Sequence, residues 1–297
     1  MNSKDFDLIL KLCKDELKIC NLNNIKIQRL GGLTNRNYMV DTEAGLYIVR
    51  LPGEGTEELI NRKEEHICTD LANQIDIDSQ LLYFDDKTGI KISRYIHGAK
   101  TMNYSLVRDR QNMKAIAELL NKMHSCGESI PVIFDVFEKI EEYENLIKKQ
   151  RNTLLWDDYE ETKRKVYELK DEVDQMEVQS VMCHNDPLCE NFVKGKNKMY
   201  LVDWEYAGMN DPMWDLADVF IEAAFTLDEE ETFNNFYFGQ EPAEHFKYRI
   251  LINKIFLDFL WSLWGLQRYS FGADLLEYAN NRYARAKEHL TMLAISQ

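Results

Sequence analysis

The chain has 297 residues, of which 45% are hydrophobic, 29% charged and 11% aromatic. This composition is that of a globular protein with a sizeable core, and it excludes a disordered chain. The 36 basic and 51 acidic residues give a net charge of −15. A surface of this sign repels phosphate backbones and anionic lipids, so we expect neither a nucleic acid nor a membrane as a partner.

Cysteine spacing and the N-terminal stretch indicate the compartment. The six cysteines are scattered without Cys-x-x-Cys spacing, which favours reduced thiols over a zinc site or a dithiol motif. The first residues, MNSKDFDLILKLCKDELK, are acidic where a secretory signal would be basic and then apolar. The most apolar stretch, 250–266, contains Asn253, Lys254 and Asp258, which suits a buried helix better than a membrane span. We therefore expect a cytoplasmic protein.

The first hundred residues mix two periodicities. After an opening helix, alternating apolar positions predict strands in 24–40, around a Gly-Gly turn, and in 45–52. Residues 56–72 have helical spacing with Thr56 at the cap. Residues 79–96 predict two further strands around a turn at Asp85 to Gly89. These elements predict a small antiparallel sheet with one helix laid across it.

From about Met102 the pattern becomes mostly helical. Helical periodicity covers 111–125, 137–150 and 159–176, and helices continue from Pro212 to the end. Two short strands, 191–193 and 199–203, interrupt the helices and are joined by a turn. We predict an α+β fold, with residues 1–98 as an N-terminal nucleotide-binding lobe and residues 99–297 as a larger, mostly helical lobe.

Three polar residues have the order that phosphoryl transfer to an alcohol requires. Asp186 lies five residues before Asn191, the spacing of a kinase catalytic loop, and Asp203 ends an apolar strand twelve residues later. A carboxylate can accept the hydroxyl proton, and Asn and Asp oxygens suit Mg²⁺. A lone pair of this kind is usually a solvated loop, so the prediction depends on the ordered set. His184 belongs to it, and we expect this side chain to hold the loop rather than carry a proton.

A helix start follows this loop. Asn210, Asp211 and Pro212 combine capping side chains with proline in the first turn. We expect Asp215, in that first turn, to cap the helix or brace the catalytic loop and to do no chemistry.

A second set of residues indicates a nucleotide clamp. Gly31 and Gly32 would let backbone amides approach phosphates, although Gly-Gly also marks plain hairpins. Arg50 is the strong cation of its strand, and Glu65 lies on the helix that follows. A strand cation braced by a helix carboxylate holds the phosphates in kinase-like lobes. The alternative is a surface ion pair.

With these residues in place the chain resembles the choline/ethanolamine kinases, and among them the bacterial LicA-type choline kinases. These belong to the aminoglycoside-phosphotransferase branch of the protein-kinase-like two-lobed fold. The resemblance runs nearly end to end, through LGGLTNRNY, GTEELINRKEE, CHNDPLCENF, LVDWEYAGMNDPMWDLA, FIEAAF, WSLWGLQRY and EYANNRYARA. The stretch beginning at Asp203 is the most specific, and the glycine loop is much less so.

The resemblance implies ATP as donor, Mg²⁺ as cofactor and phosphocholine as product. It makes Asp186 the base, makes Asn191 and Asp203 metal ligands, and places Glu205 beside the metal. The residues it implies for ATP binding are Gly31, Gly32, Thr34, Asn35, Arg50, Glu65, Arg94 and Ile96, the last two near adenine. Arg50 stands where protein kinases have lysine, and the choline kinases commonly accept arginine there. Asp-Trp-Glu replaces Asp-Phe-Gly, so regulation by a flip of this segment is not expected.

The acceptor pocket implied by the family is aromatic. A quaternary ammonium donates no hydrogen bond, so aromatic faces and a carboxylate recognise it. Trp261, Trp264 and Tyr278 match the family's pocket, with Glu222 as the acidic partner and Asp186 at the hydroxyl. Tryptophans three residues apart on a helix are otherwise usually core.

Three functions remain open on the sequence. A choline kinase fits one onium group in a compact aromatic site. A kinase of ethanolamine, an aminoglycoside or another alcohol is the first alternative. An inactive onium-binding protein is the second, although Asp186, Asn191 and Asp203 are all present. The sequence does not give the oligomeric state.

Overall fold

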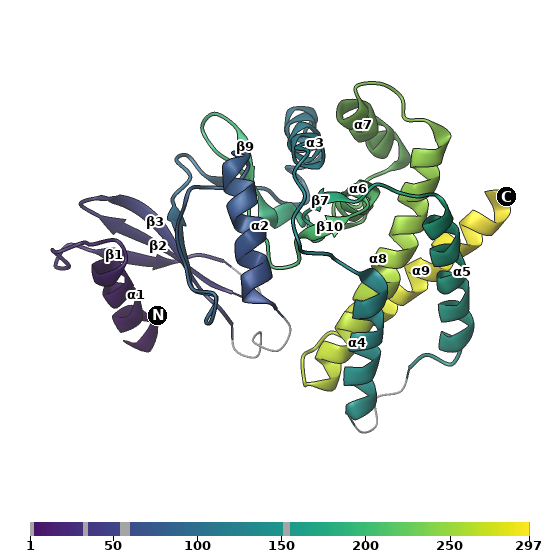
Figure 1. Ribbon diagram of the computed structural model, residues 1–297, viewed down its shortest axis with the longest axis horizontal. Helices are drawn as coiled ribbons and strands as arrows, with labels where there is room; N and C mark the ends of the chain where they lie inside the picture. Colours follow the sequence, from purple (N-terminus) through teal and green to yellow (C-terminus); the bar gives the residue numbers. More distant parts are fainter. Residues whose placement is uncertain (1–2, 32–34, 54–59, 151–154, 297) are drawn as a thin grey trace. The chain divides into compact units, whose positions relative to one another are not determined.

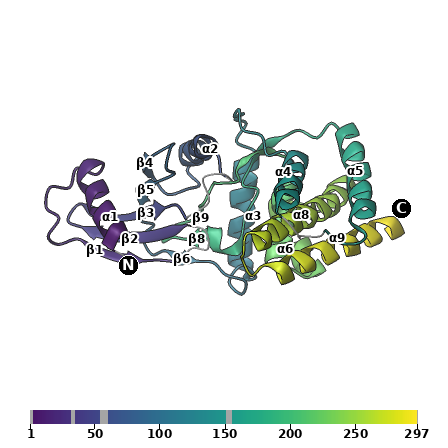
Figure 2. The same cartoon turned by 90° about the horizontal axis from the view of Figure 1, so that it is seen from below.

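The computed structural model describes residues 3–31, 35–53, 60–150 and 155–296. The chain packs into two compact units, residues 1–126 with 189–208 and residues 127–188 with 209–297. These units are defined by packing, and the lobe boundary between residues 98 and 99 stays a prediction. Figures 1 and 2 show the elements of both units.

The first unit is built on a five-stranded antiparallel sheet in the order β1-β2-β3-β5-β4. A second sheet has the order β6-β8-β9. The elements of this unit are α1 (Ser3–Asp15), β1 (Lys26–Arg29), β2 (Arg36–Thr42), β3 (Gly45–Leu51), α2 (Arg62–Gln74), β4 (Leu81–Phe84), β5 (Lys91–Arg94), β6 (Lys100–Thr101), α3 (Arg110–His124), the 3₁₀ turn η1 (Cys189–Asn191), β8 (Phe192–Lys194) and β9 (Met199–Leu201).

Side chains of one sheet face form a core with α1. Tyr38 and Val40 of β2 lie opposite Val49 and Tyr47 of β3, and all four are buried with Ile9 of α1. Asp5 fastens the same helix to β2, accepting hydrogen bonds from Tyr38 Oη at 2.6 Å and Arg36 Nε at 3.0 Å. The sequence predicted an opening helix but not the element against which it packs, and the structure shows that it packs on the sheet.

The predicted start of α2 is wrong. Thr56 lies outside the described residues, and the helix begins at Arg62 with Asn61 as its N-cap. The Asn61 side chain accepts hydrogen bonds from the backbone amides of Lys63 and Glu64. Asparagine is as good a cap as threonine, so both sites satisfied the sequence pattern.

The second unit is mostly helical. Its elements are α4 (Val136–Lys149), α5 (Tyr159–Gln175), β7 (Val181–Cys183), β10 (Gly208–Asn210), α6 (Pro212–Glu222), α7 (Leu227–Phe238), α8 (Glu244–Ser270) and α9 (Leu276–Ser296). The short strands β7 and β10 pair with each other, and neither was predicted. Asp211 caps α6 with Pro212 at its first position, as predicted.

Helix α8 is the central element of the second unit, in contact with α4, α5, α6 and α9 (Figure 2). Its polar residues are buried and paired. Asn253 donates to Asp211 at 3.0 Å, Lys254 bonds Glu230 at 2.6 Å, and Asp258 binds Arg285. This confirms the prediction of a buried helix. None of the described helices has both the length and the apolar composition needed to cross a bilayer.

We predict that Ile9→Ala destabilises the first unit. Ile9 has no exposed surface and joins α1 to the sheet core. Removing a buried isoleucine should lower the free energy of unfolding by about 2–5 kcal/mol. Urea unfolding measures this change, and Lys11→Ala, at an exposed position of the same helix, is the control. Equal stability of both variants would mean that α1 is not part of the core.

Candidate active site

A hairpin brings Asn191 close to the segment that carries Asp203. Strands β8 and β9 are antiparallel, with Phe192 opposite Leu201. The Val202 amide donates a hydrogen bond to the Asn191 carbonyl at 3.0 Å. Because one strand begins where the other ends, Asn191 lies against the residue that precedes Asp203. The two predicted metal ligands are therefore neighbours.

Trp204 anchors the end of this hairpin. Its side chain is fully buried, and its indole N–H donates to Asp78 Oδ2 at 2.9 Å. Asp203 has φ of 73°, a left-handed conformation that aspartate tolerates better than most residues. Its side chain keeps 30% of its surface exposed. A buried ring next to a partly exposed carboxylate fixes the backbone while leaving Asp203 accessible to a ligand.

Arg50 links the sheet, α2 and the hairpin. Its guanidinium forms an ion pair with Glu65 and lies 3.3 Å from Asp203 Oδ1 through Nη1, while Nη2 donates to the Gly89 carbonyl at 2.9 Å. Arg50 and Glu65 are only 3% and 1% exposed, so the surface-ion-pair alternative is wrong. Burial raises the pKa of Glu65, but Arg50 outweighs burial and holds that pKa below its usual value.

Glu205 lies beside the same network. Its Oε2 accepts a hydrogen bond from Asn35 Nδ2 at 3.2 Å and lies 3.6 Å from Arg62 Nη1. Burial and the Asp203 carboxylate raise the pKa of Glu205 to about 7. Arg62 also bonds Glu65 at 2.7 Å. It was not singled out in the sequence, where it was one of several basic residues on a helix.

Carboxylate and amide oxygens gathered here fit a Mg²⁺ ion. Asn191, Asp203 and Glu205 offer hard oxygen ligands, and Asn35 Oδ1 is a buried acceptor with no hydrogen-bond partner in the described structure. Mg²⁺ takes few protein ligands and keeps several waters, so two or three such groups suffice. Asp203 and Glu205 are close enough for one carboxylate to raise the pKa of the other, and a cation between such groups would relieve their repulsion.

The remaining predicted nucleotide residues are placed only in part. Gly31 accepts a hydrogen bond from Asn37 at 3.3 Å, while Gly32 and Thr34 lie outside the described residues. Arg94 ends β5 and its amide donates to the Gln80 carbonyl at 2.9 Å. Ile96 is half-buried in the following turn. Adenine contacts at this connection stay a prediction.

In the second unit, a carboxylate fixes the loop that carries Asp186. The two oxygens of Asp215 accept the backbone amides of His184 and Asn185, each at 2.8 Å. Trp214 donates its indole N–H to the Asn185 carbonyl at 3.1 Å. His184 is fully buried, which suits the predicted holding role. Asp186 follows these clamped residues and is half-buried.

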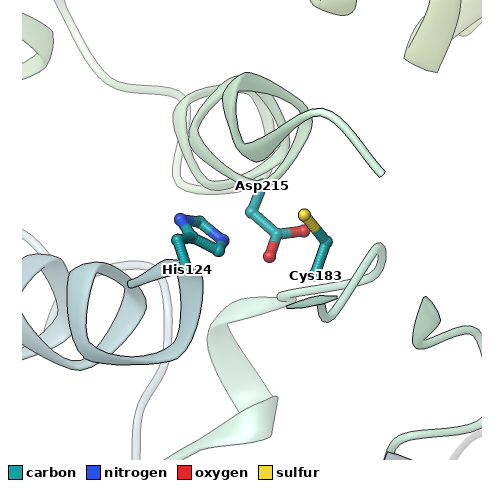
Figure 3. Close-up of side chains that lie close together, drawn as sticks. All are labelled: His124, Cys183 and Asp215. Carbon is teal, nitrogen blue, oxygen red and sulfur yellow. The ribbon is translucent and has the colours of Figure 1, made fainter. Parts of the chain in front are cut away.

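Asp215 acts from the first turn of α6, as the sequence predicted. Figure 3 shows its carboxylate extending from the helix toward Cys183, at the end of β7. Burial and Asp215 raise the pKa of the Cys183 thiol well above its usual value. A buried neutral thiol and a carboxylate occupied by two amides are structural groups, and they leave Asp186 as the half-buried acid of the loop.

The three predicted aromatic residues of the acceptor pocket lie together. The Trp261 and Trp264 rings are perpendicular with centroids 6.0 Å apart, and Trp264 meets Tyr278 of α9 at 5.8 Å. Trp261 is buried, whereas Trp264 and Tyr278 are half-buried. A Cβ at Gly265 would lie 2.8 Å from Tyr278 Cδ1, so glycine is required here for α9 to approach α8.

Glu222, the predicted acidic partner, already has a cation. Arg282 of α9 forms an ion pair with Glu222, bonds Asp258 of α8 at 3.0 Å and lies over the Tyr278 ring at 5.1 Å. Arg282 was missed, although EYANNRYARA contains it. Only the fold reveals that it faces α6 and α8 together.

Comparison with known proteins identifies the family. The model of the choline/ethanolamine kinase family matches residues 27–247. Protein LicA of Haemophilus influenzae is 24% identical over 266 residues, covering 88% of this chain and 78% of its own. The crystal structure of choline kinase LicA from Streptococcus pneumoniae is 35% identical, with a TM-score of 0.84, covering 98% of this chain and 100% of that one.

A structure of LicA in complex with AMP is 33% identical, with a TM-score of 0.81 and coverage of 97% and 98%. The fold is the protein-kinase-like fold that aminoglycoside phosphotransferases share. This agrees with the predicted small antiparallel sheet and mostly helical remainder. The chain belongs to the choline/ethanolamine kinase family.

Proposed function

We propose that this protein transfers the γ-phosphoryl group of ATP to the hydroxyl of choline, giving phosphocholine and ADP. The observation that carries the proposal is the hairpin that sets Asn191 beside the Asp203 segment while Arg50 contacts Asp203. Ligands for a cation and a clamp for phosphates are what phosphoryl transfer demands of a protein. Membership of the family and the AMP complex of a relative support ATP as the donor.

Asp186 is the base in this proposal. It accepts the hydroxyl proton of the acceptor as the oxygen attacks the γ-phosphorus and the bond to the ADP oxygen breaks. Its backbone is held in place, because Asp215 and Trp214 form hydrogen bonds with the backbone of the two residues before it. Positioning of this kind supplies much of the catalysis in phosphoryl transfer, since the reaction needs little covalent help.

Asn191, Asp203 and Glu205 would hold Mg²⁺. The ion would neutralise charge on the phosphates of ATP. Arg50 supplies a fixed positive charge to the same phosphates, and Glu65 keeps its guanidinium in place. Gly31, Gly32, Thr34 and Asn35 would cover the phosphates, with adenine at Arg94 and Ile96.

The acceptor site would be formed by Trp261, Trp264 and Tyr278 with Glu222. Aromatic faces attract an onium group that has no hydrogen to donate. The half-buried Trp264 and Tyr278 offer such faces, and the buried Trp261 supports them. Ethanolamine is the second candidate acceptor, because the family includes kinases of both alcohols and a carboxylate can accept hydrogen bonds from a primary ammonium. We place the reaction in the cytoplasm, where ATP and free thiols occur together.

Asp186→Asn should lower kcat by at least about 10²- to 10⁴-fold, because the amide cannot accept the proton. Binding of choline and Mg-ATP should remain within about twofold, since Asn keeps the shape. A coupled ADP-release assay and calorimetry measure the two effects. Glu190→Gln, at an exposed acid nearby, should retain full activity. A fully active Asp186→Asn variant would eliminate Asp186 as the base.

Trp264→Ala should raise the choline KM by about 5- to 30-fold, which corresponds to the loss of one cation–π contact of ~1–2 kcal/mol. The KM for Mg-ATP should change much less. Tyr269→Ala, which removes a 42% exposed aromatic ring from the same helix, is the matched control. Equal changes in both KM values would make Trp264 a structural residue.

A further inference from the structure

A buried carboxyl group on α6 has no hydrogen-bond partner in the described structure. Asp218 is 1% exposed, and both of its side-chain oxygens are buried without a donor. It lies one helical turn before Glu222 and one turn after Asp215. These three acids therefore share one face of the helix. Backbone amides of the loop donate hydrogen bonds to Asp215, and Arg282 forms an ion pair with Glu222. No donor of either kind is bonded to Asp218 in the described structure.

The charges around Asp218 are mainly negative. Glu222 and Asp186 act on it most strongly, followed by the cation Arg282 and then by Asp215. On α8, which packs against α6, Lys254 is bonded to Glu230, Arg249 to Asp211, and Asp258 to both Arg282 and Arg285.

Cys183 of β7 and His184 after it lie beside Asp215, and both are fully buried. Burial, Glu222 and Asp186 raise the pKa of Asp218 well above its usual value. An ionised carboxylate without a donor is costly to bury, so these surroundings favour Asp218 as the neutral acid.

A quaternary ammonium cation, which has no N–H donor, is the ligand that reverses this balance. Its charge would stabilise the buried carboxylate by electrostatic attraction alone, without donating a hydrogen bond to it. Asp186, which the proposed reaction sets at the acceptor hydroxyl, and Glu222, set at the onium group, both act on Asp218. Asp218 is buried one helical turn from Glu222 on the same face of α6, so its charge state depends on these two acids and on what binds beside them.

We propose that Asp218 selects cationic acceptors by giving up its proton to solvent when the onium group binds. This rests on the proposed phosphorylation of choline. Before binding, Asp218 is a neutral acid and choline is a free cation. After binding, the two form a carboxylate–onium pair, and one proton has passed to the solvent. A neutral alcohol of the same shape gains nothing from this exchange. Asp218 does not touch the reacting atoms, so it determines specificity and is not a catalytic residue.

The test measures choline binding by calorimetry, without ATP, in two buffers of different ionisation enthalpy. The wild-type protein should release up to about one proton per choline below the pKa of free Asp218. Asp218→Asn should release none. Its choline KM should rise at least about tenfold. The neutral analogue of choline, in which a tert-butyl group replaces the trimethylammonium group, should keep its KM in this variant. Asp228→Asn, at an exposed acid on α7, should match the wild type.

Thermal melting separates this role from a structural one. Removing an unpartnered buried acid should leave Asp218→Asn at least as stable as the wild type. If the variant fails to fold, the pH dependence of KM in the wild-type protein tests the inference instead. The KM for choline should fall with rising pH, whereas the KM for the neutral alcohol should not.

Two results would overturn the inference while choline turnover persists. One is choline binding without proton release, and the other is proton release that Asp218→Asn leaves unchanged. Absence of choline phosphorylation by the wild-type protein would instead remove the proposed function, and absence of choline binding would remove both.

Discussion

The buried guanidinium of Arg50 is the interaction on which the first unit depends. It ties β3 to α2 through Glu65, to the β4–β5 turn through Gly89 and to the hairpin through Asp203. Removing one partner of such a network leaves a buried charge uncompensated, which costs several kcal/mol. Arginine suits this position better than lysine because its planar fork bonds several groups in different directions. The departure from the protein-kinase lysine thus has a structural reason in this chain.

In the second unit, acidic side chains from different helices lie close together and need a shared cation. Arg282 contacts Glu222 and Asp258 and covers Tyr278, so one cation serves α6, α8 and α9. Gly265 lets α9 come near enough for this contact. The Arg282 ion pairs thus add to packing in holding Tyr278 of α9 against α8. A rigid aromatic site needs less ordering when a ligand enters.

The sequence predicted the secondary-structure elements and the motif residues better than it predicted which side chains pair with one another. Periodicity located most helices and the strands of the sheet, and the Asp186-to-Asn191 spacing with Asp203 identified a phosphoryl-transfer pattern. Short strands such as β7 and β10 were not predicted, because three residues are too few to show the alternation of apolar and polar side chains that is typical of a strand. Asn61 was missed as a cap because Thr56 satisfied the same pattern. Arg62 and Arg282 escaped because a single arginine on a helix does not reveal which acids face it. Their partners come from other elements, and only the tertiary structure selects them.

Helix α6 shows why spacing alone could not assign the acids. Asp211, Asp215, Asp218 and Glu222 recur every three or four residues and therefore share one face. Asp211 caps the helix and binds Arg249, and Asp215 receives two loop amides. Glu222 receives Arg282. Donors from three different elements thus convert three acids into structural or paired groups, while Asp218 has no donor among the residues that the structure describes. The same residue type at the same spacing acquires different chemistry because each turn of the helix faces a different neighbour.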